Sequence, residues 1–318
     1  MKKIGLLAEC AGAARIGISA HIRPDGDAVG SCMALYYYLR KGLPQAQICV
    51  FLEKPSDVFQ ELKHIGDIDS EFSDQGTFDV FFAMDTAKER LGGARKYFET
   101  AGKTINIDHH ISNSQGCGDV NVVEPRASST AEVLYEQMEE ELLDEDIAKA
   151  LYIGIIHDSG VFQYSNTSPR TMEIGAKLIG FGFDFSRLIE ETFYQKNYIQ
   201  SQIMGRALME SIRFMDGRCI VSCVSRRMME FYGAAPVDLE GIVNQLRNIK
   251  GVDCAIFMYE TGVLEYKVSL RSNENVDVSR VASYFGGGGH VRAAGCSMNG
   301  TFHDVVNNLS QQIAQQLH

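Results

Sequence analysis

Three short apolar runs in the first half of the chain end in side chains that can bind a metal ion. Each run has the length and composition of a buried strand, and each is followed closely by acids or histidines. The side chains at the three ends are His21, Asp25 and Asp27, then Asp85, and then Asp108, His109 and His110. Because open α/β sheets bind ligands beyond the carboxyl ends of their strands, we expect these side chains to share one pocket.

Strands and helices alternate along residues 1–196, which predicts βαβ units and a mostly parallel sheet flanked by helices, an α/β fold. The run 78–84 is almost continuously apolar, as expected for a parallel strand covered on both faces. The predicted strands are 16–20, 48–52, 78–84, 104–107 and 119–123. The predicted helices are 4–14, 30–39, 57–64, 89–100, 128–140, 145–156, 169–180 and 185–193.

A second, smaller α/β domain is predicted because 318 residues is long for one compact core. We expect a catalytic domain at 1–196, a helical linker at 197–212 and a second domain at 213–318, with a cleft between the domains. The second domain has predicted strands at 219–224, 253–259 and 264–269, and predicted helices at 239–248, 278–285 and 302–316.

Charge and composition narrow the function classes. The chain has 41 acidic and 30 basic residues and a net charge of −11, which argues against binding long nucleic acid through many phosphate contacts. The net charge does not exclude a small phosphate substrate held by metal ions and a few arginines. The eight cysteines include no CxxC pair, which favours a reduced compartment, and no apolar run approaches the roughly 18 residues of a transmembrane helix. We expect a cytoplasmic protein.

The motif His21-x-x-x-Asp25-x-Asp27 combines one imidazole with two carboxylates. In an extended turn Asp25 and Asp27 project to the same side, because side chains alternate along an extended chain. Nitrogen and carboxylate ligands together suit Mn²⁺ or a similar ion better than Mg²⁺. Asp85 would add a further carboxylate. The structural alternatives are a surface loop closed by an Asx-turn for the motif, and a helix cap for Asp85.

The triplet Asp108-His109-His110 has three different expected roles. Adjacent histidines in an extended chain point in opposite directions, so only one of them can bind a given ion directly. We expect His109 to be a ligand, His110 to face a substrate, and Asp108 to orient an imidazole. The alternatives are two histidines on a polar loop, or a structural hydrogen bond from His110.

Asp158 follows the predicted helix 145–156, at the end where the helix dipole disfavours an acid. A cation would compensate for this. A cation would also reduce the repulsion among five carboxylates that we expect near one point. These carboxylates are Asp25, Asp27, Asp85, Asp108 and Asp158. Together with His21 and His109 they offer ligands for two ions.

The ordered set of motifs resembles the DHH phosphoesterase superfamily over nearly the whole chain. The resemblance implies two Mn²⁺ ions about 3.5–4 Å apart, with Mg²⁺ or Co²⁺ as substitutes. It implies that one ion is held by His21, Asp25 and Asp85. The other would be held by Asp27, Asp85, His109 and Asp158, with Asp85 bridging. His110 would contact the scissile phosphate or assist the leaving group, and Ser159 stands where such proteins often have Thr.

The motif Gly286-Gly287-Gly288-Gly289-His290 resembles part of the C-terminal domain that accompanies many members of the superfamily. Consecutive glycines can form a concave anion-binding nest, which a helix N-terminus beside them would strengthen. We expect His290 and Arg271 to meet phosphate oxygens. Arg292, expected on a helix surface, is a weaker candidate. The chain has no GxxxxGK[ST] loop and no strand-linked GxGxxG, so NTP or NAD binding has no support.

The two-domain layout is similar to that of superfamily members that degrade very short RNA (nanoRNA) and dephosphorylate 3′-phosphoadenosine-5′-phosphate (pAp). RecJ-type exonucleases carry extra nucleic-acid-binding domains, and family II pyrophosphatases have a second domain without this glycine run. We therefore predict a hydrolase that degrades nanoRNA from the 5′ end to mononucleotides and converts pAp to AMP. The alternatives are a phosphodiesterase for cyclic di-AMP or linear pApA, and a nucleotide-binding sensor. No membrane partner is expected, and a homodimer is left open.

Overall fold

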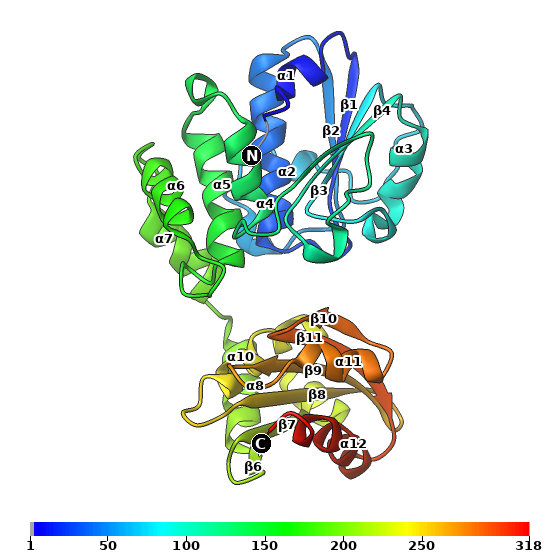
Figure 1. The fold of residues 1–318 in the computed structure, drawn as a ribbon, viewed down its shortest axis with the longest axis vertical. Helices are drawn as coiled ribbons and strands as arrows, with labels where there is room; N and C mark the ends of the chain where they lie inside the picture. Colours follow the sequence, from blue (N-terminus) through cyan, green and yellow to red (C-terminus); the bar gives the residue numbers. More distant parts are fainter. Residues whose placement is uncertain (1–2, 318) are drawn as a thin grey trace. The chain divides into compact units, whose positions relative to one another are not determined.

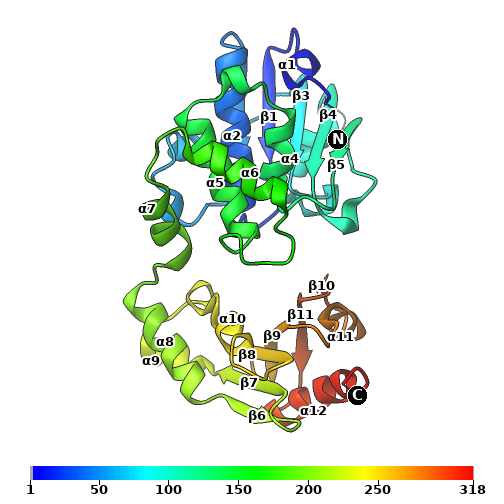
Figure 2. The same cartoon turned by 60° about the vertical axis from the view of Figure 1, so that its left-hand side comes forward.

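The computed structural model describes residues 3–317. The chain folds into two compact units, Met1–Gln195 and Lys196–His318, which Figures 1 and 2 show from two directions. Each unit is built around its own sheet and buries its own apolar side chains.

The first unit contains a five-stranded, fully parallel sheet in the order β2-β1-β3-β4-β5. Its strands are β1 (Arg15–Ser19), β2 (Gln47–Phe51), β3 (Val80–Met84), β4 (Lys103–Asp108) and β5 (Val120–Val123). The predicted α/β class with a mostly parallel sheet is confirmed. Because β1, β3 and β4 are neighbours, the three strand ends that precede the ligand-type side chains lie side by side.

Helices cover both faces of this sheet, with α3 on the face opposite α2 and α5 (Figure 1). The helices are α1 (Leu6–Glu9), α2 (Gly26–Gly42), α3 (Arg95–Thr100), α4 (Thr130–Gln137), α5 (Glu145–Asp158), α6 (Pro169–Ile179) and α7 (Phe185–Ile189), and a π-helical turn follows at Glu190–Tyr194. Phe82 of β3 packs into the larger apolar core with α2 and α5, whereas Phe81 packs into a smaller core with α3. The strand is therefore covered on both faces, as its composition predicts.

Helices α2 and α5 approach each other closely at two glycines. A Cβ at Gly30 would lie 2.5 Å from the carbonyl oxygen of Ala150, and a Cβ at Gly154 would lie 2.6 Å from Asp27 Oδ1. Neither position has room for a side chain. This contact places Asp27, in the first turn of α2, against the helix that ends at Asp158.

Three predicted helices, 4–14, 57–64 and 89–100, are α-helical over no more than half of their predicted length. Only α1 is helical within 4–14, because Gly5 and Gly12 have φ values of 67° and 79°. Segment 57–64 forms only a 3₁₀ turn at Asp57–Phe59, and His64 adopts a φ of 61°. Within 89–100 only α3 is α-helical, and Gly92 before it has a φ of 53°. Left-handed backbone cannot continue an α-helix, so α1 begins only after Gly5, and no α-helix passes through Gly12, His64 or Gly92.

The second unit contains a six-stranded mixed sheet in the order β10-β11-β9-β8-β7-β6, in which only β7 and β8 are parallel. The strands are β6 (Ile212–Phe214), β7 (Cys219–Val224), β8 (Cys254–Gly262), β9 (Glu265–Ser272), β10 (Gly288–His290) and β11 (Ala293–Asn299). The helices are α8 (Tyr198–Met209), α9 (Arg226–Tyr232), α10 (Ile242–Arg247), α11 (Val278–Tyr284) and α12 (Phe302–Ala314). Strands β6, β10 and β11 and helix α9 are not evident in the sequence pattern. β10 in particular is Gly-Gly-His and carries no apolar alternation.

Helix α8 lies in the segment 197–212, the predicted linker. Its side chains Ile203 and Ala207 are fully buried and pack with Ile220 of β7 and Ile242 of α10. Ser222 of β7 donates a hydrogen bond to the Ala207 carbonyl oxygen at 2.7 Å. This helix therefore contributes to the core of the second unit.

Candidate active site

The ligand-type side chains of the first unit converge beyond the ends of β1, β3 and β4. His21 lies two residues after β1, Asp85 directly follows β3, and Asp108 is the last residue of β4. Asp25 is the N-cap of α2, and Asp158 is the last residue of α5. Three overlapping groups of side chains each bring ligand atoms within 4.8 Å of one another and could each hold a metal ion: His21, Asp25 and Asp85; Asp27, His109 and Asp158; and Asp85, His109 and His110. The first two groups contain the ligands implied by the family resemblance.

The first group consists of His21, Asp25 and Asp85. His21 Nε2 lies 3.6 Å from Asp25 Oδ2 and 3.3 Å from Asp85 Oδ2. The other ring nitrogen, Nδ1, lies 2.9 Å from the carbonyl oxygen of Ile22. A carbonyl can only accept, so Nδ1 carries the proton and Nε2 presents a lone pair to the carboxylates when the ring is neutral. A backbone carbonyl that fixes the tautomer in this way is typical of metal-binding histidines.

The second group consists of Asp27, His109 and Asp158. His109 Nε2 lies 3.0 Å from Asp158 Oδ2 and 4.0 Å from Asp27 Oδ2. His109 Nδ1 faces the Ala127 carbonyl oxygen at 3.3 Å, which again leaves Nε2 as the lone-pair nitrogen. Within residues 3–317, Nε2 is buried among these carboxylates, at ion-pair distance from Asp158 but without a hydrogen bond of good geometry. A divalent cation held here would be bound by the nitrogen and the carboxylates together.

Asp85 stands between the two groups and presents one oxygen to each. Its Oδ2 is the atom near His21, whereas its Oδ1 lies 3.6 Å from His109 Nε2. The residue adopts a φ of 55°, which is uncommon for residues other than glycine. Its N–H donates to the Ile107 carbonyl oxygen at 2.9 Å, which holds the backbone in this conformation. A carboxylate shared in this way has the geometry of a bridging ligand.

Asp108 forms hydrogen bonds with both the side chain and the backbone of His110. Asp108 Oδ1 accepts from the backbone N–H groups of His109 and His110 at 2.7 and 3.1 Å, and it lies 2.8 Å from His110 Nδ1. Burial tends to raise the pKa of Asp108, but hydrogen bonds from His110 and Asn113 outweigh burial and lower this pKa. Asp108 is therefore ionised, and His110 Nδ1 is the donor. These contacts support the expected orienting role of Asp108, and the ring that Asp108 orients is that of His110.

A buried amide network lies behind Asp108, and it is not evident from the sequence motifs. Asn113 Nδ2 donates to Asp108 Oδ2 at 2.6 Å and to Asn106 Oδ1 at 3.0 Å. Asn106 in turn donates to the carbonyl oxygens of Ala83 and Thr86, at 2.9 and 3.0 Å. The network ties β4 to the chain around Asp85. One signal for it exists in the sequence, because Asn106 is a polar residue inside an apolar strand.

The pKa values of the ligand-type side chains are displaced from their usual ranges. Burial tends to lower the pKa of His21 and of His109, but the neighbouring carboxylates outweigh it and raise both pKa values to about 10. Burial and the charge of Asp85 raise the pKa of Asp27 well above its usual range. Burial raises the pKa of Asp158 to about 6, although 28% of its side chain stays exposed and His109 opposes the change. Without a cation this cluster retains protons, and a bound cation would displace them.

The glycine run of the second unit differs from the expectation of a nest beside a helix N-terminus. Helix α11 ends at Tyr284, so the run follows a helix C-terminus, and Gly288–His290 continues as the edge strand β10. A Cβ at Gly287 would lie 2.2 Å from the carbonyl oxygen of Gly295, so close packing against β11 explains this glycine. Arg292 lies in the turn between β10 and β11 and not on a helix, contrary to the prediction.

Arg271 and His290 lie in one row across three adjacent strands. Ala293 of β11 pairs with Arg271 of β9 on one side and with His290 of β10 on the other. Directly opposed residues of an antiparallel sheet project from the same face, and two strand spacings amount to about 10 Å. Arg271 Nε donates to Asn244 Oδ1 at 3.1 Å, which steadies the guanidinium. Arg271 and His290, the two side chains expected to meet phosphate oxygens, therefore share one face of the second sheet.

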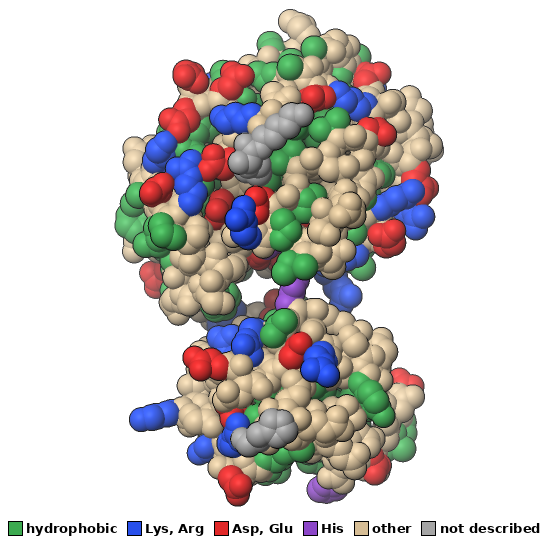
Figure 3. All heavy atoms as spheres, viewed as in Figure 1, with side chains coloured by type: hydrophobic (Ala, Val, Ile, Leu, Met, Phe, Trp, Pro, Cys, Tyr) green, Lys and Arg blue, Asp and Glu red, His purple; other side chains and the backbone are tan. Residues whose placement is uncertain are grey.

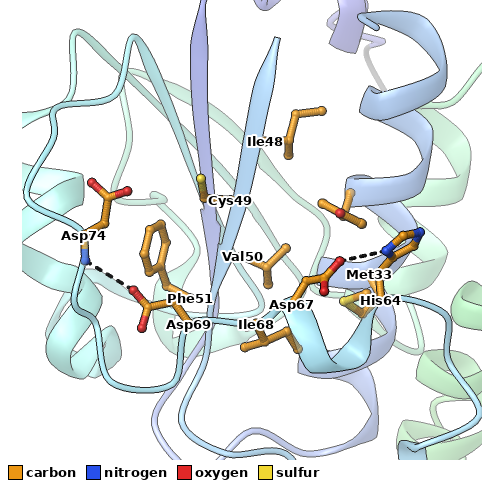
Figure 4. A pocket seen from close by; sticks show the side chains of 11 residues that line it. Met33, Ile48, Cys49, Val50, Phe51, His64, Asp67, Ile68, Asp69 and Asp74 are labelled. Atoms are coloured by element: carbon orange, nitrogen blue, oxygen red, sulfur yellow. Dashed lines mark hydrogen bonds and ion pairs between the residues drawn. The ribbon is translucent and has the colours of Figure 1, made fainter.

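A separate cavity of about 130 Å³ lies beside the edge strand β2 (Figure 4). None of the residues that converge at the candidate site lines it. Its acids already have partners: Asp67 pairs with His64 at 2.7 Å, and Asp69 Oδ2 accepts from the backbone N–H of Asp74 at 3.3 Å. We do not assign this cavity to the site.

Fold and site together define a parallel α/β unit with a candidate centre for divalent ions beyond its strand ends, followed by a unit with a mixed sheet. Residues 15–155 match the DHH family, N-terminal domain, and residues 216–318 match the DHHA1 domain. The chain belongs to the DHH family. The resemblance seen in the sequence motifs is thus confirmed. Among residues 3–317, no helix is long and apolar enough to cross a membrane.

Three known proteins resemble the chain over most of its length. It is 30% identical over 312 residues to the bifunctional oligoribonuclease and PAP phosphatase NrnA of Thermus thermophilus, covering 94% of this chain and 89% of the relative. It is 28% identical over 285 residues to the protein of the same name from Bacillus subtilis, covering 87% of each. An exopolyphosphatase-related protein from Bacteroides fragilis has a similar structure, with a TM-score of 0.87, 25% identity, and coverage of 96% of this chain and 93% of that one.

Proposed function

We propose that the chain is a metal-dependent phosphoesterase that degrades very short oligoribonucleotides to mononucleotides and removes the 3′-phosphate of pAp. The observation that carries the proposal is Asp85, which directs one carboxylate oxygen to each of two groups of ligand-type side chains. Two relatives named as oligoribonuclease and PAP phosphatase align with most of the chain and support this substrate class.

The proposed centre holds two Mn²⁺ ions. One would be bound by His21, Asp25 and Asp85, and the other by Asp27, Asp85, His109 and Asp158. When bound, such a pair lowers the pKa of a shared water and stabilises the attacking and leaving oxygens of a displacement at phosphorus. The position of His109 Nε2 among carboxylates and the high pKa of Asp27 both support cation binding, because a cation would be bound by the nitrogen and would neutralise the buried carboxylate.

His110 is the proposed group that acts on the substrate itself. Burial tends to lower the pKa of His110, but the hydrogen bond to Asp108 and the charge of Asp85 raise it. A raised pKa favours the protonated ring, and a protonated ring can contact a phosphate oxygen or donate to the leaving oxygen. Asp108 would act through His110, by holding Nδ1–H and thereby fixing the orientation of the ring.

The second unit is the proposed source of substrate selectivity. Arg271, His290 and the backbone of Gly286, Gly287, Gly288 and Gly289 would meet a phosphate or the nucleotide that carries it. The shared row of Arg271 and His290 supports a joint role.

On the face shown in Figure 3, acidic and basic side chains are interspersed and form no basic stripe, which is consistent with short substrates. All eight cysteines are free, which supports a cytoplasmic location.

One comparison of substrates tests the proposal. Purified protein with Mn²⁺ is offered pAp, pApA, a five-nucleotide RNA and cyclic di-AMP, and AMP or mononucleotide release is followed over time. Rapid turnover of pAp and the short RNA is expected. Cleavage confined to cyclic di-AMP, or to pApA, would replace the proposal by the corresponding phosphodiesterase. Tight binding of one nucleotide with no turnover of any would indicate a sensor.

A further inference from the structure

A five-residue segment before and at the start of α4 contacts most of the second ligand group. We call residues 127–131 the cap segment. The Thr130 and Ala131 N–H groups donate to Asp27 Oδ2 and Oδ1 at 2.6 and 2.9 Å. The Thr130 hydroxyl donates to Asp85 Oδ1 at 3.0 Å, and the Ala127 carbonyl faces His109 Nδ1 at 3.3 Å. The contacts reach three of the four proposed ligands of the second ion.

Thr130 is the one residue of this segment that holds two carboxylates at once. Its backbone N–H and its hydroxyl bond to two different ligands, and its side chain is fully buried. The hydroxyl contacts the oxygen of Asp85 that faces His109, and not the oxygen that faces His21. The contact thus restricts rotation of the proposed bridging carboxylate. Among residues 3–317, no hydrogen bond joins the cap segment to His21 or Asp25.

The cap segment is anchored from behind by a buried acid. Glu132 Oε2 accepts from the Ser128 hydroxyl at 2.6 Å, from the Ser128 N–H at 3.2 Å and from the Thr171 hydroxyl at 2.7 Å. Ser129 caps α4 by accepting from the Glu132 N–H at 3.1 Å. These bonds satisfy a carboxylate that is 94% buried, and they hold the segment in one position.

Asp158 is linked to the same segment through its backbone. Asn166 Nδ2 donates to the carbonyl oxygens of Ser128 and Asp158, at 2.9 and 3.1 Å. Every proposed ligand of the second ion therefore bonds to the cap segment or shares a partner with it. Groups that orient metal ligands from outside the coordination sphere are worth about 10–100-fold in metal affinity or activity.

We propose that Thr130 is a positioning residue for the metal centre, holding Asp27 and the bridging Asp85 in register so that the second ion can bind. This inference rests on the proposed function, because it presupposes that the ligand groups bind ions. It predicts that the Thr130 hydroxyl governs metal affinity, and that the larger effect falls on the ion held by Asp27, His109 and Asp158.

The test compares Mn²⁺ binding by the wild-type chain and three variants, using calorimetric titration of the metal-free protein. Thr130→Val keeps the shape and the backbone N–H but removes the hydroxyl, and we expect one of the two ions to bind about 10–100-fold more weakly. Thr130→Ser restores the hydroxyl and should bind within a few-fold of wild type. Thr104→Val is the matched control, because the Thr104 hydroxyl bonds to Asp119 at the other end of β4, and wild-type affinity is expected. Circular dichroism establishes that each variant is folded.

The outcomes separate this inference from the proposed function. Wild-type protein that binds no Mn²⁺ would refute the metal centre itself, and the positioning role with it. Two ions in wild type and unchanged affinities in Thr130→Val would overturn the positioning role alone. Equal weakening in Thr130→Val and Thr130→Ser would also overturn it, because packing would then explain the effect. If Thr130→Val does not fold, weaker binding in Thr130→Ala with rescue in Thr130→Ser supports the inference, and the absence of that difference contradicts it.

Discussion

Oδ1 of Asp108 holds His110 twice, once through the backbone N–H at 3.1 Å and once through ring Nδ1 at 2.8 Å. Both contacts come from one carboxylate oxygen, so backbone and ring are fixed relative to each other. Because the low pKa of Asp108 keeps it ionised, the ring nitrogen must be the donor. The proposed function uses this arrangement to present the remaining edge of the ring to a phosphate.

Asp108→Asn should therefore reduce turnover without removing metal. The amide cannot supply the charge that raises the pKa of His110, so the ring is more often neutral at pH 7. We expect kcat on pAp to fall about 10–100-fold while two ions remain bound. Steady-state kinetics and metal analysis measure the two effects. Asp119→Asn is a matched control at the other end of β4, where Asp119 accepts from Thr104, and it should leave kcat unchanged. A loss of metal in Asp108→Asn would assign Asp108 to the coordination sphere.

Asp85→Ala should remove both ions, since one of its oxygens faces His21 in the first ligand group and the other faces His109 in the second. We expect metal content to fall from two ions per chain to less than one. Activity should fall by more than about 100-fold, which is the upper end for a residue that only orients a metal ligand. Plasma emission spectroscopy after gel filtration reports the metal content. Asp79→Ala, near the start of β3, removes a carboxylate that accepts from Ala14 and Arg15 N–H groups and should retain both ions. Retention of one tightly bound ion in Asp85→Ala would contradict the bridging assignment.

Metal binding should release protons and strengthen as pH rises. The pKa values of His21 and His109 are raised to about 10 in the metal-free protein, so both rings are protonated at pH 7. A ligand must be neutral, so each ring loses its proton when an ion binds, and affinity increases with pH until the rings titrate near pH 10. Calorimetry in buffers of different ionisation enthalpy should show release on the order of one proton per ion at pH 7.5. Binding enthalpies that do not depend on the buffer would refute this coupling.

Gly287→Ala should damage the second unit far more than Gly288→Ala. A Cβ at Gly287 would lie 2.2 Å from the Gly295 carbonyl oxygen and 2.6 Å from Cys296 Cβ, whereas a Cβ at Gly288 meets nothing within 4 Å. Overpacking of this kind costs about 1–3 kcal/mol and would push β10 away from β11. Urea unfolding followed in the second unit, together with KM for pAp, measures the effect. Equal KM values for the two variants and wild type would argue against a role of this strand in substrate binding.

Much of the site could be anticipated because its members follow strand ends, where local pattern is informative. An apolar run of five residues followed by His21, Asp85 or Asp108 marks both a buried strand and its carboxyl end. The glycine run is ambiguous in the sequence, because consecutive glycines permit a nest and a tightly packed edge strand equally well. The choice depends on the pairing of β10 with β11, which brings the Gly295 carbonyl oxygen against Gly287, and β10 itself has no apolar alternation that would reveal a strand. Asn113 and Thr130 carry no local signal that distinguishes them from ordinary turn and cap residues.

The sequence by itself determined the parallel sheet of the first unit and the identity of the ligand-type side chains, because both depend on short-range pattern along single strands. Only the tertiary structure decided how those side chains face one another. The Thr130 N–H reaches Asp27 across 103 positions of the chain, and Gly30 and Gly154 allow α2 and α5 to come close enough for Asp27 to lie beside Asp158. Contacts of this kind arise from helices packed against a common sheet. No periodicity within a single segment encodes them.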